Sequence, residues 1–305
     1  MEEQTEMREI VKEIPILNLR RSNIGISNYI KSNKPFLICK ISEECGGLAI
    51  SKYYNELPKN IALHEIISFV RNKAGIYSNN PKDYIDYAGL YYDIVKNSSA
   101  IAYLPANISQ LRTFAEINFY NNLKHIAPIH HESLEPYYAT MDNLIPWSHQ
   151  LLGKKVLIIH PFTDSFKLQL KKKFKIYPKN PIFLEGQEFV FYKSYNTAGK
   201  NHIHRDWKDT FQRMCVEISK LDFDIALIGC GGYGIPLAGF IYDKLKKPAI
   251  QIGGGLQLLF GVMGKRWENT EMWETIIREQ ECKFIKPSGS EILINKHLVN
   301  DGCYW

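Results

Sequence analysis

The sequence predicts an α/β protein with a Rossmann-like, mostly parallel sheet and helices on both faces. Three observations support this fold class. Short apolar runs typical of buried strands alternate with longer segments of helical periodicity. The second half contains a succession of strand, glycine turn, helix and strand, which is the pattern of a parallel βαβ unit. The chain of 305 residues is 45% apolar, which is enough for a large core.

The first half mixes short predicted strands with helices. Residues 35–39 form an apolar run that predicts a buried strand, and residues 101–104 predict a second strand that ends before Pro105. Residues 61–71 and 84–96 carry apolar side chains at spacings of three and four, which predicts two amphipathic helices.

The second half shows a more regular alternation of elements. Pro236 suits the first turn of its helix, and the lysines between 244 and 247 suit a helix C-terminus, where the dipole favours cations. A weak shift in composition near residue 150 is the one candidate for a subdomain boundary in an otherwise single domain over residues 1–305. The predicted elements are a strand over 154–160, a helix from 163 to 174, a loop over 192–204, a helix over 207–220, a strand over 224–228, a helix over 235–246 and a strand over 248–252.

Charge and cysteine content argue against several classes of protein. The net charge of +6 comes from dispersed lysines, without the aromatic-interleaved basic stripe of a nucleic-acid-binding protein. The six cysteines form no CxxC pair, so no zinc or redox motif is indicated. Residues 1–13 lack the apolar segment of a signal peptide, and no apolar run approaches the ~20 residues of a membrane span. We therefore expect a cytoplasmic protein with no membrane span.

Glycine is concentrated in one part of the sequence, with ten of the twenty glycines between Gly229 and Gly264. The first group follows a predicted strand, precedes a predicted helix and matches G-x-G-x-x-G. Such a turn lets the backbone approach a pyrophosphate at a helix N-terminus. The same glycines are also consistent with close helix–strand packing alone, and both interpretations stay open. The predicted donor-binding residues here are Gly229, Gly231, Gly232, Tyr233 and Gly234.

A nicotinamide dinucleotide fits this motif poorly. The Rossmann fingerprint expects an acidic residue at the end of the second strand. In this chain that strand ends with Gln251 and Ile252. Too few residues follow the motif for the usual six-stranded cofactor domain. A nucleotide or a nucleotide-sugar is therefore the better candidate.

A second glycine loop follows the next predicted strand, at the edge where open α/β sheets bind ligands. A basic pair beyond it could neutralise phosphate, and a tryptophan could stack on a base or a sugar. An exposed basic pair and a core tryptophan are the structural alternative. The candidate residues are Gly253, Gly254, Gly255, Gln257, Lys265, Arg266 and Trp267.

Two further candidates follow predicted strands in the same way. His160 ends its strand at the presumed ligand edge of the sheet. It could line a pocket there, or it could be a core histidine whose hydrogen bonds are made within the protein. Glu43 and Glu44 follow the first strand and precede two glycines. These carboxylates could hold a divalent cation that bridges a diphosphate, or they could be two solvated residues of a turn.

Several segments resemble bacterial proteins that carry the GT-D glycosyltransferase fold. The resemblance extends from about Pro35 to the C-terminus. It implies a Rossmann-like fold, a nucleotide-sugar donor and a role in building surface glycans. It also implies a metal-binding acidic motif near Glu43 or Glu44; Ser42 and Gln251 depart from the family pattern. The segments that carry the resemblance are residues 223–238, 253–261 and 264–267, with shorter pieces at 72–77, 146–147, 155–162 and 302–305.

The function expected from the sequence is transfer of a sugar from a nucleoside-diphosphate sugar to a glycan acceptor, assisted by Mn²⁺ or Mg²⁺. Arg266 and Lys265 would stabilise the charge of the leaving group, and Glu43 or Glu44 would hold the metal. Two other functions stay open. One is a non-catalytic nucleotide-binding or assembly protein of a glycan pathway, and the other is an NAD-dependent oxidoreductase.

Overall fold

The computed structural model describes residues 14–58, 60–104, 109–171 and 176–305 and contains one seven-stranded sheet. Every neighbouring pair of strands is parallel, in the order β3-β2-β1-β7-β6-β4-β5. Helices flank this sheet, so the predicted α/β, Rossmann-like class is confirmed. The strands are β1 (Leu37–Lys40), β2 (Ala100–Tyr103), β3 (Ala127–His130), β4 (Lys155–His160), β5 (Glu188–Lys193), β6 (Ile225–Ile228) and β7 (Ala249–Gln251).

The strand sequences are apolar almost throughout because both faces of the sheet are covered. Along β4, Leu157 and Ile159 point into one hydrophobic cluster, and Val156 and Ile158 point into the other. This alternation follows from the two-residue period of a strand. Buried parallel strands therefore show continuous apolar runs, which is the pattern that made them recognisable in the sequence.

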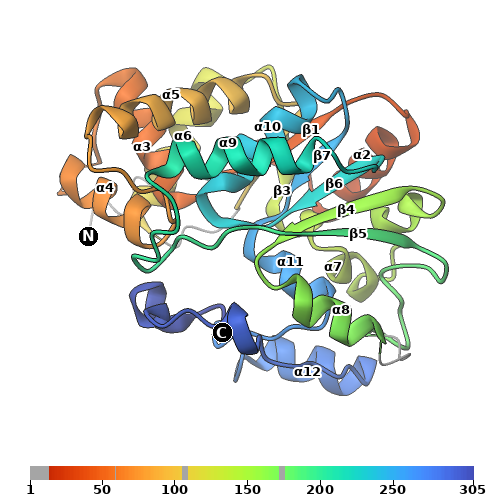
Figure 1. The fold of residues 1–305 in the computed structure, drawn as a ribbon. Coiled ribbons are helices and arrows are strands. Elements are labelled where there is room, and N and C mark those ends of the chain that lie inside the picture. The colour runs from red at the N-terminus through yellow and green to blue at the C-terminus, as the bar shows by residue number, and fades with distance from the viewer. Residues whose placement is uncertain (1–13, 59, 105–108, 172–175) are drawn as a thin grey trace.

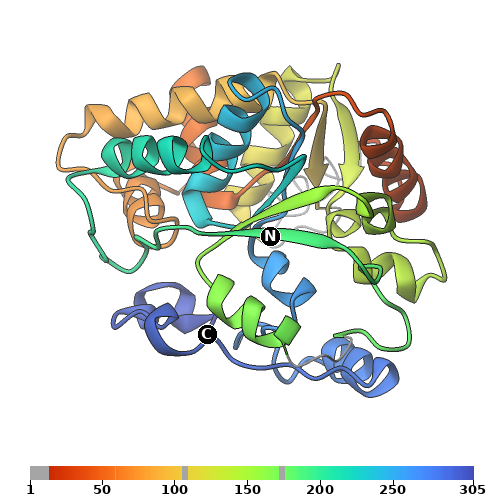
Figure 2. The same ribbon diagram turned by 45° about the vertical axis from the view of Figure 1, so that its right-hand side comes forward.

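The helices form two layers with the sheet between them (Figures 1 and 2). Helices α3, α5, α6, α9 and α10 bury apolar side chains in one cluster, whereas α2, α7, α8, α11 and α12 contribute to the other. None of the described helices combines the length and hydrophobicity that a membrane span needs. The helices are α2 (Leu19–Lys31), α3 (Glu43–Tyr54), α4 (Leu63–Asn72), α5 (Lys82–Lys96), α6 (Gln110–Asn122), α7 (Pro136–Met141), α8 (Thr163–Lys171), α9 (Trp207–Ile218), α10 (Gly234–Asp243), α11 (Leu256–Leu259) and α12 (Glu271–Gln280).

Both halves of the chain contribute to the same sheet. Strands β1 to β3 come from the first half and β4 to β7 from the second, and they join where Leu37 is paired with Ala249. Residues before and after position 150 are therefore hydrogen-bonded within one sheet.

The structure contains elements that were not predicted, among them α2, α6, β3 and α12. It also differs from the predicted elements at three places. Strand β5 occupies the start of the predicted loop 192–204; it is an edge strand with half-exposed side chains, so it lacks a buried apolar run. Helix α10 ends at Asp243, short of the predicted 246, because Lys246 has a left-handed φ of 56°. Glu43 and Glu44 form the first turn of α3 rather than a free turn. The expectations for residues 1–13 and Phe174 concern parts of the chain outside the described residues.

Candidate functional site

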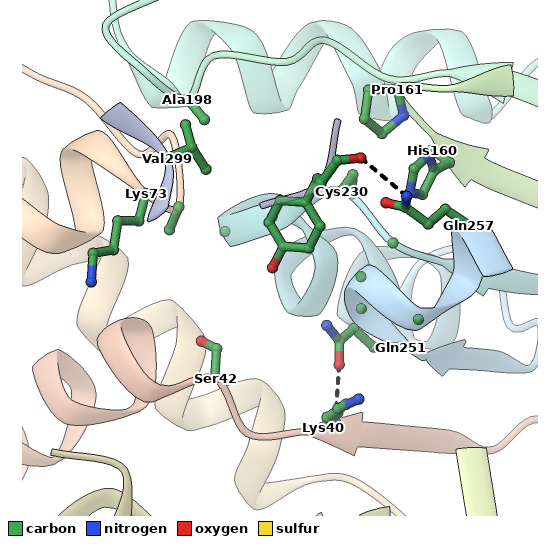
Figure 3. Close-up of a pocket in the computed structure, with 18 of the residues that line it drawn as sticks. Lys40, Ser42, Lys73, His160, Pro161, Ala198, Cys230, Gln251, Gln257 and Val299 are labelled. Carbon is green, nitrogen blue, oxygen red and sulfur yellow. Dashed lines mark hydrogen bonds between the residues drawn. The ribbon is translucent and has the colours of Figure 1, made fainter. Parts of the chain in front are cut away.

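A cavity of about 320 Å³ lies at the carboxyl edge of the sheet. Residues that follow β1, β4, β6 and β7 line it, as the close-up shows for Lys40 and Ser42, His160 and Pro161, and Gln251 (Figure 3). The chain leaves β1 and β6 toward α3 and α10, in one helical layer, and leaves β4 and β7 toward α8 and α11, in the other. Neighbouring loops therefore diverge to opposite faces, which is where open α/β sheets form ligand crevices.

The two glycine loops contact each other at the base of this cavity. A Cβ atom on Gly229 would lie 2.5 Å from the carbonyl oxygen of Gly253 and 3.0 Å from Cδ2 of His160. Neither backbone can move away easily, because each continues a central strand. A residue without a side chain is therefore required at position 229 for the loops to meet.

The rest of the first glycine loop packs against the segment between α4 and α5. Gly231 has a φ of 58°. The N–H of Gly232 donates to the carbonyl of Ala74 at 2.8 Å, so this group is already satisfied within the protein. Close packing, the structural alternative, thus accounts for Gly232. Gly229, Gly231, Gly232 and Tyr233 still line the cavity, whereas Gly234 does not and packs against Gln251.

The second glycine loop, Gly253–Gly255, makes room for two side chains. A Cβ on Gly254 would lie 2.4 Å from Cε1 of Tyr304, and one on Gly255 would lie 2.2 Å from Oε1 of Glu135. All three glycines line the cavity, and Gly253 has a φ of 80°. Larger residues here would displace the tyrosine and the glutamate from the cavity wall.

The side chain of Gln257 connects the cavity wall to the C-terminal segment by a hydrogen bond. Its Nε2 donates to the carbonyls of Val262 and Tyr304, both at 3.1 Å. Its Oε1 is buried and has no partner among the described residues. Gln257 therefore shapes the wall and leaves one acceptor unused.

Lys40 lies where β1 ends and is held by two interactions. Its backbone N–H donates to Oε1 of Gln251 at 3.0 Å, and its Nζ lies 3.0 Å from Oε1 of Glu135. Tyr137 donates a hydrogen bond to the other carboxylate oxygen of Glu135. Burial lowers the pKa of Lys40, and the attraction to Glu135 opposes this shift.

Glu43 and Glu44 both line the cavity from the N-terminal turn of α3. Burial raises the pKa of Glu44, and the neighbouring charge of Glu43 adds to the shift. Lys73 lies 3.9 Å from Glu44 and partly offsets the negative charge. Among the described residues no group of three or more His, Cys, Asp or Glu side chains could hold a metal. Two carboxylates fit a divalent cation only when ligand phosphates and water complete its coordination.

His160 presents a neutral N–H to the cavity. Its Nδ1 accepts a hydrogen bond from the backbone N–H of Phe162 at 3.0 Å, so the proton of the neutral ring lies on Nε2. Burial lowers the pKa of His160 to about 3. The imidazole is therefore a hydrogen-bond donor without charge at neutral pH.

The structure places the two residues of the predicted basic pair, Lys265 and Arg266, differently with respect to the cavity. Arg266 is exposed at the cavity wall, with its guanidinium 5.8 Å from the ring centre of Trp267, which also lines the cavity. Lys265 is absent from the wall. Its side chain is 58% exposed, and its Nζ lies 3.1 Å from Oδ2 of Asp301. Residues 265–269 form a turn, and of the two basic residues only Arg266 lines the cavity, so only Arg266 is placed to meet a cavity ligand.

The sequence indicated only part of this cavity. Four lining residues come from the β2–β3 side of the sheet and were not predicted: Arg112 on α6, His131 after β3, Glu135 before α7 and Tyr138 on α7. None belongs to a recognisable motif. Lys40 directly follows the first predicted strand, and that position could have identified it.

Comparisons with known proteins found no match. No family model matches the chain, and no curated protein or solved structure is similar to it at the level of significance applied.

Proposed function

We propose that the protein is a glycosyltransferase that takes its sugar from a nucleoside-diphosphate sugar and transfers it to a glycan acceptor. The observation that carries this proposal is a single cavity that brings together both glycine loops, Glu43, Glu44 and Arg266. Its position at the carboxyl edge of a parallel sheet is typical of nucleotide sites in this class of fold.

The residues of the cavity would act on different parts of the donor. Arg266 can bind the diphosphate with two parallel N–H groups and stabilise the charge that develops on the leaving group. The Gly253–Gly255 loop lets the donor approach the backbone closely. His160 would donate a hydrogen bond from Nε2 to an oxygen of the donor. Trp267 offers a face for a base or a sugar.

Glu43 and Glu44 have two chemically distinct roles available. They fit a Mn²⁺ or Mg²⁺ ion whose coordination is completed by diphosphate oxygens, and such an ion would neutralise the leaving group. Alternatively, the raised pKa of Glu44 suits a general acid or base. A binding measurement with and without the cation separates these roles, since only the first makes donor binding depend on metal.

The experiment is a thermal-shift screen of nucleotide-sugars and nucleoside diphosphates, with and without Mn²⁺. A ligand at one hundred times its Kd should stabilise the fold by about 2.7 kcal/mol. We expect Arg266→Ala to lose this stabilisation and Lys265→Ala, the matched control, to keep it. Absence of stabilisation by every nucleotide would refute the proposal.

The other functions expected from the sequence give different results in the same assay. A non-catalytic nucleotide-binding protein would be stabilised by nucleotides yet show neither sugar transfer nor donor hydrolysis. An NAD-dependent oxidoreductase would be stabilised by NAD(H). The cytoplasmic location also stays a prediction, which localisation of the tagged chain would test.

A further inference from the structure

Arg112, His131 and Lys40 form a basic cluster on the β2–β3 side of the cavity. They come from α6, from the 3-10 turn after β3 and from the end of β1. The positive charges of Lys40 and Arg112 contribute to lowering the pKa of His131, after the larger effect of burial. All three side chains line the same cavity, so one ligand could contact them.

Two nitrogen atoms in this cluster lack hydrogen-bond partners. Nδ1 of His131 and Nη2 of Arg112 are both buried without a partner among the described residues. Nη2 does lie 2.8 Å from Oε1 of Glu116, but Nε of Arg112 already donates to the same oxygen at 2.9 Å. Buried polar groups are nearly always satisfied in native proteins. These atoms therefore point to a missing hydrogen-bonding group in the adjoining cavity.

The charge of the cluster indicates the kind of group. Lys40 is paired with Glu135 and Arg112 with Glu116, so each cation has one carboxylate. Arg266 adds a further positive charge at the cavity wall, and its charge contributes to lowering the pKa of both Lys40 and His131. Glu116, Glu135 and the nearby Glu44 largely balance these positive charges, but lysine and arginine side chains carry only hydrogen-bond donors. A small oxyanion, which only accepts hydrogen bonds, therefore suits the cluster.

We propose that Arg112, His131 and Lys40 form a second anion-binding subsite for a phosphate or carboxylate group of the substrate, separate from the site of the nucleotide diphosphate. The proposed subsite follows from the side chains that line the cavity; only its assignment to a sugar substrate rests on the proposed function. The sugar or the acceptor would then carry an acidic group that lies against the β2–β3 side.

Titration calorimetry with inorganic phosphate and, separately, with acetate tests this subsite and distinguishes the two oxyanions. The informative variant is Arg112→Ala combined with Glu116→Ala, which removes both members of the buried pair and leaves no uncompensated charge. His131→Ala is the second variant, in case the first does not fold. Lys265→Ala, which removes an exposed cation away from the cavity, is the matched control.

We expect both cluster variants to weaken oxyanion binding about tenfold or more, as for the loss of a hydrogen bond to a charged group. The control should bind as the wild type does. Oxyanion binding should persist at a saturating concentration of nucleoside diphosphate. Binding of neither oxyanion, unchanged binding in the variants or full displacement by the diphosphate would each overturn the proposal. Oxyanion binding without nucleotide binding would refute the proposed function and leave the subsite intact.

Discussion

Replacing Gly229 with alanine should destabilise the protein, because the two glycine loops meet at this residue. The added Cβ would lie 2.5 Å from the carbonyl oxygen of Gly253, at least 0.5 Å inside the 3.0 Å that real Cβ contacts respect. It would also lie 3.1 Å from Cβ of Leu256. Overpacking of this kind costs about 1–3 kcal/mol. Any relaxation must separate the loops, so the cavity should deform as well.

Guanidinium-induced unfolding, followed by circular dichroism, measures this cost. The matched control is Gly25→Ala in α2, where a Cβ meets no atom within 4 Å. That change should raise the free energy of unfolding by about 0.5–1 kcal/mol, because alanine is favoured over glycine inside a helix. If Gly229→Ala had the same free energy of unfolding as the wild type, or if both variants changed it equally, close packing of the two loops at Gly229 would be contradicted.

Three further predictions concern buried polar groups. Folded His160 stays neutral down to about pH 3, whereas the unfolded residue binds a proton below about pH 6.5. The free energy of unfolding should therefore fall as the pH is lowered from 6.5 to 3, by up to ~1.4 kcal/mol per pH unit. His160→Asn should flatten this slope when unfolding is measured at a series of pH values. Glu135→Ala leaves Lys40 buried without its partner and should cost about 3–5 kcal/mol of unfolding free energy; a loss below 1 kcal/mol would contradict this. Tyr87→Phe removes a buried hydrogen bond of 2.7 Å to the carbonyl of Gly232 and should cost about 1–3 kcal/mol, and an unchanged chemical midpoint would argue against that bond.

The central strands could be predicted from the sequence because they are buried on both faces. Strands β1, β4 and β6 show continuous apolar runs, and the glycine turn between β6 and α10 marks a parallel unit. Strands β3 and β5 were missed because they lie at the two edges of the sheet, where half-exposed side chains interrupt the pattern.

The candidate site was predictable where a residue follows a central strand. His160 is the last residue of β4, and Glu43, Glu44 and the Gly253–Gly255 loop follow β1 and β7 within a few residues, so strand order alone places them near one edge. Arg112 lies near this edge because it stands in the first turn of α6, the helix that follows β2, and no helix was predicted in that region.

The sequence also cannot show that Arg266 lines the cavity and Lys265 does not. Both are basic and both follow the second glycine loop. Their different placement depends on how the turn at residues 265–269 lies against Tyr304 and the C-terminal residues. The backbone N–H groups of Lys265 and Arg266 donate to the carbonyls of Trp305 and Cys303, so the orientation is set by contacts with residues that lie 40 and 37 positions further along the chain.

The most direct test of the site is a crystal structure with a nucleoside diphosphate and Mn²⁺. We predict that the diphosphate lies in the cavity, within hydrogen-bonding distance of Arg266, and against the Gly253–Gly255 loop, with the cation between its oxygens and Glu43 or Glu44. A nucleotide bound elsewhere, or a cavity that stays empty at saturating nucleotide, would contradict the account.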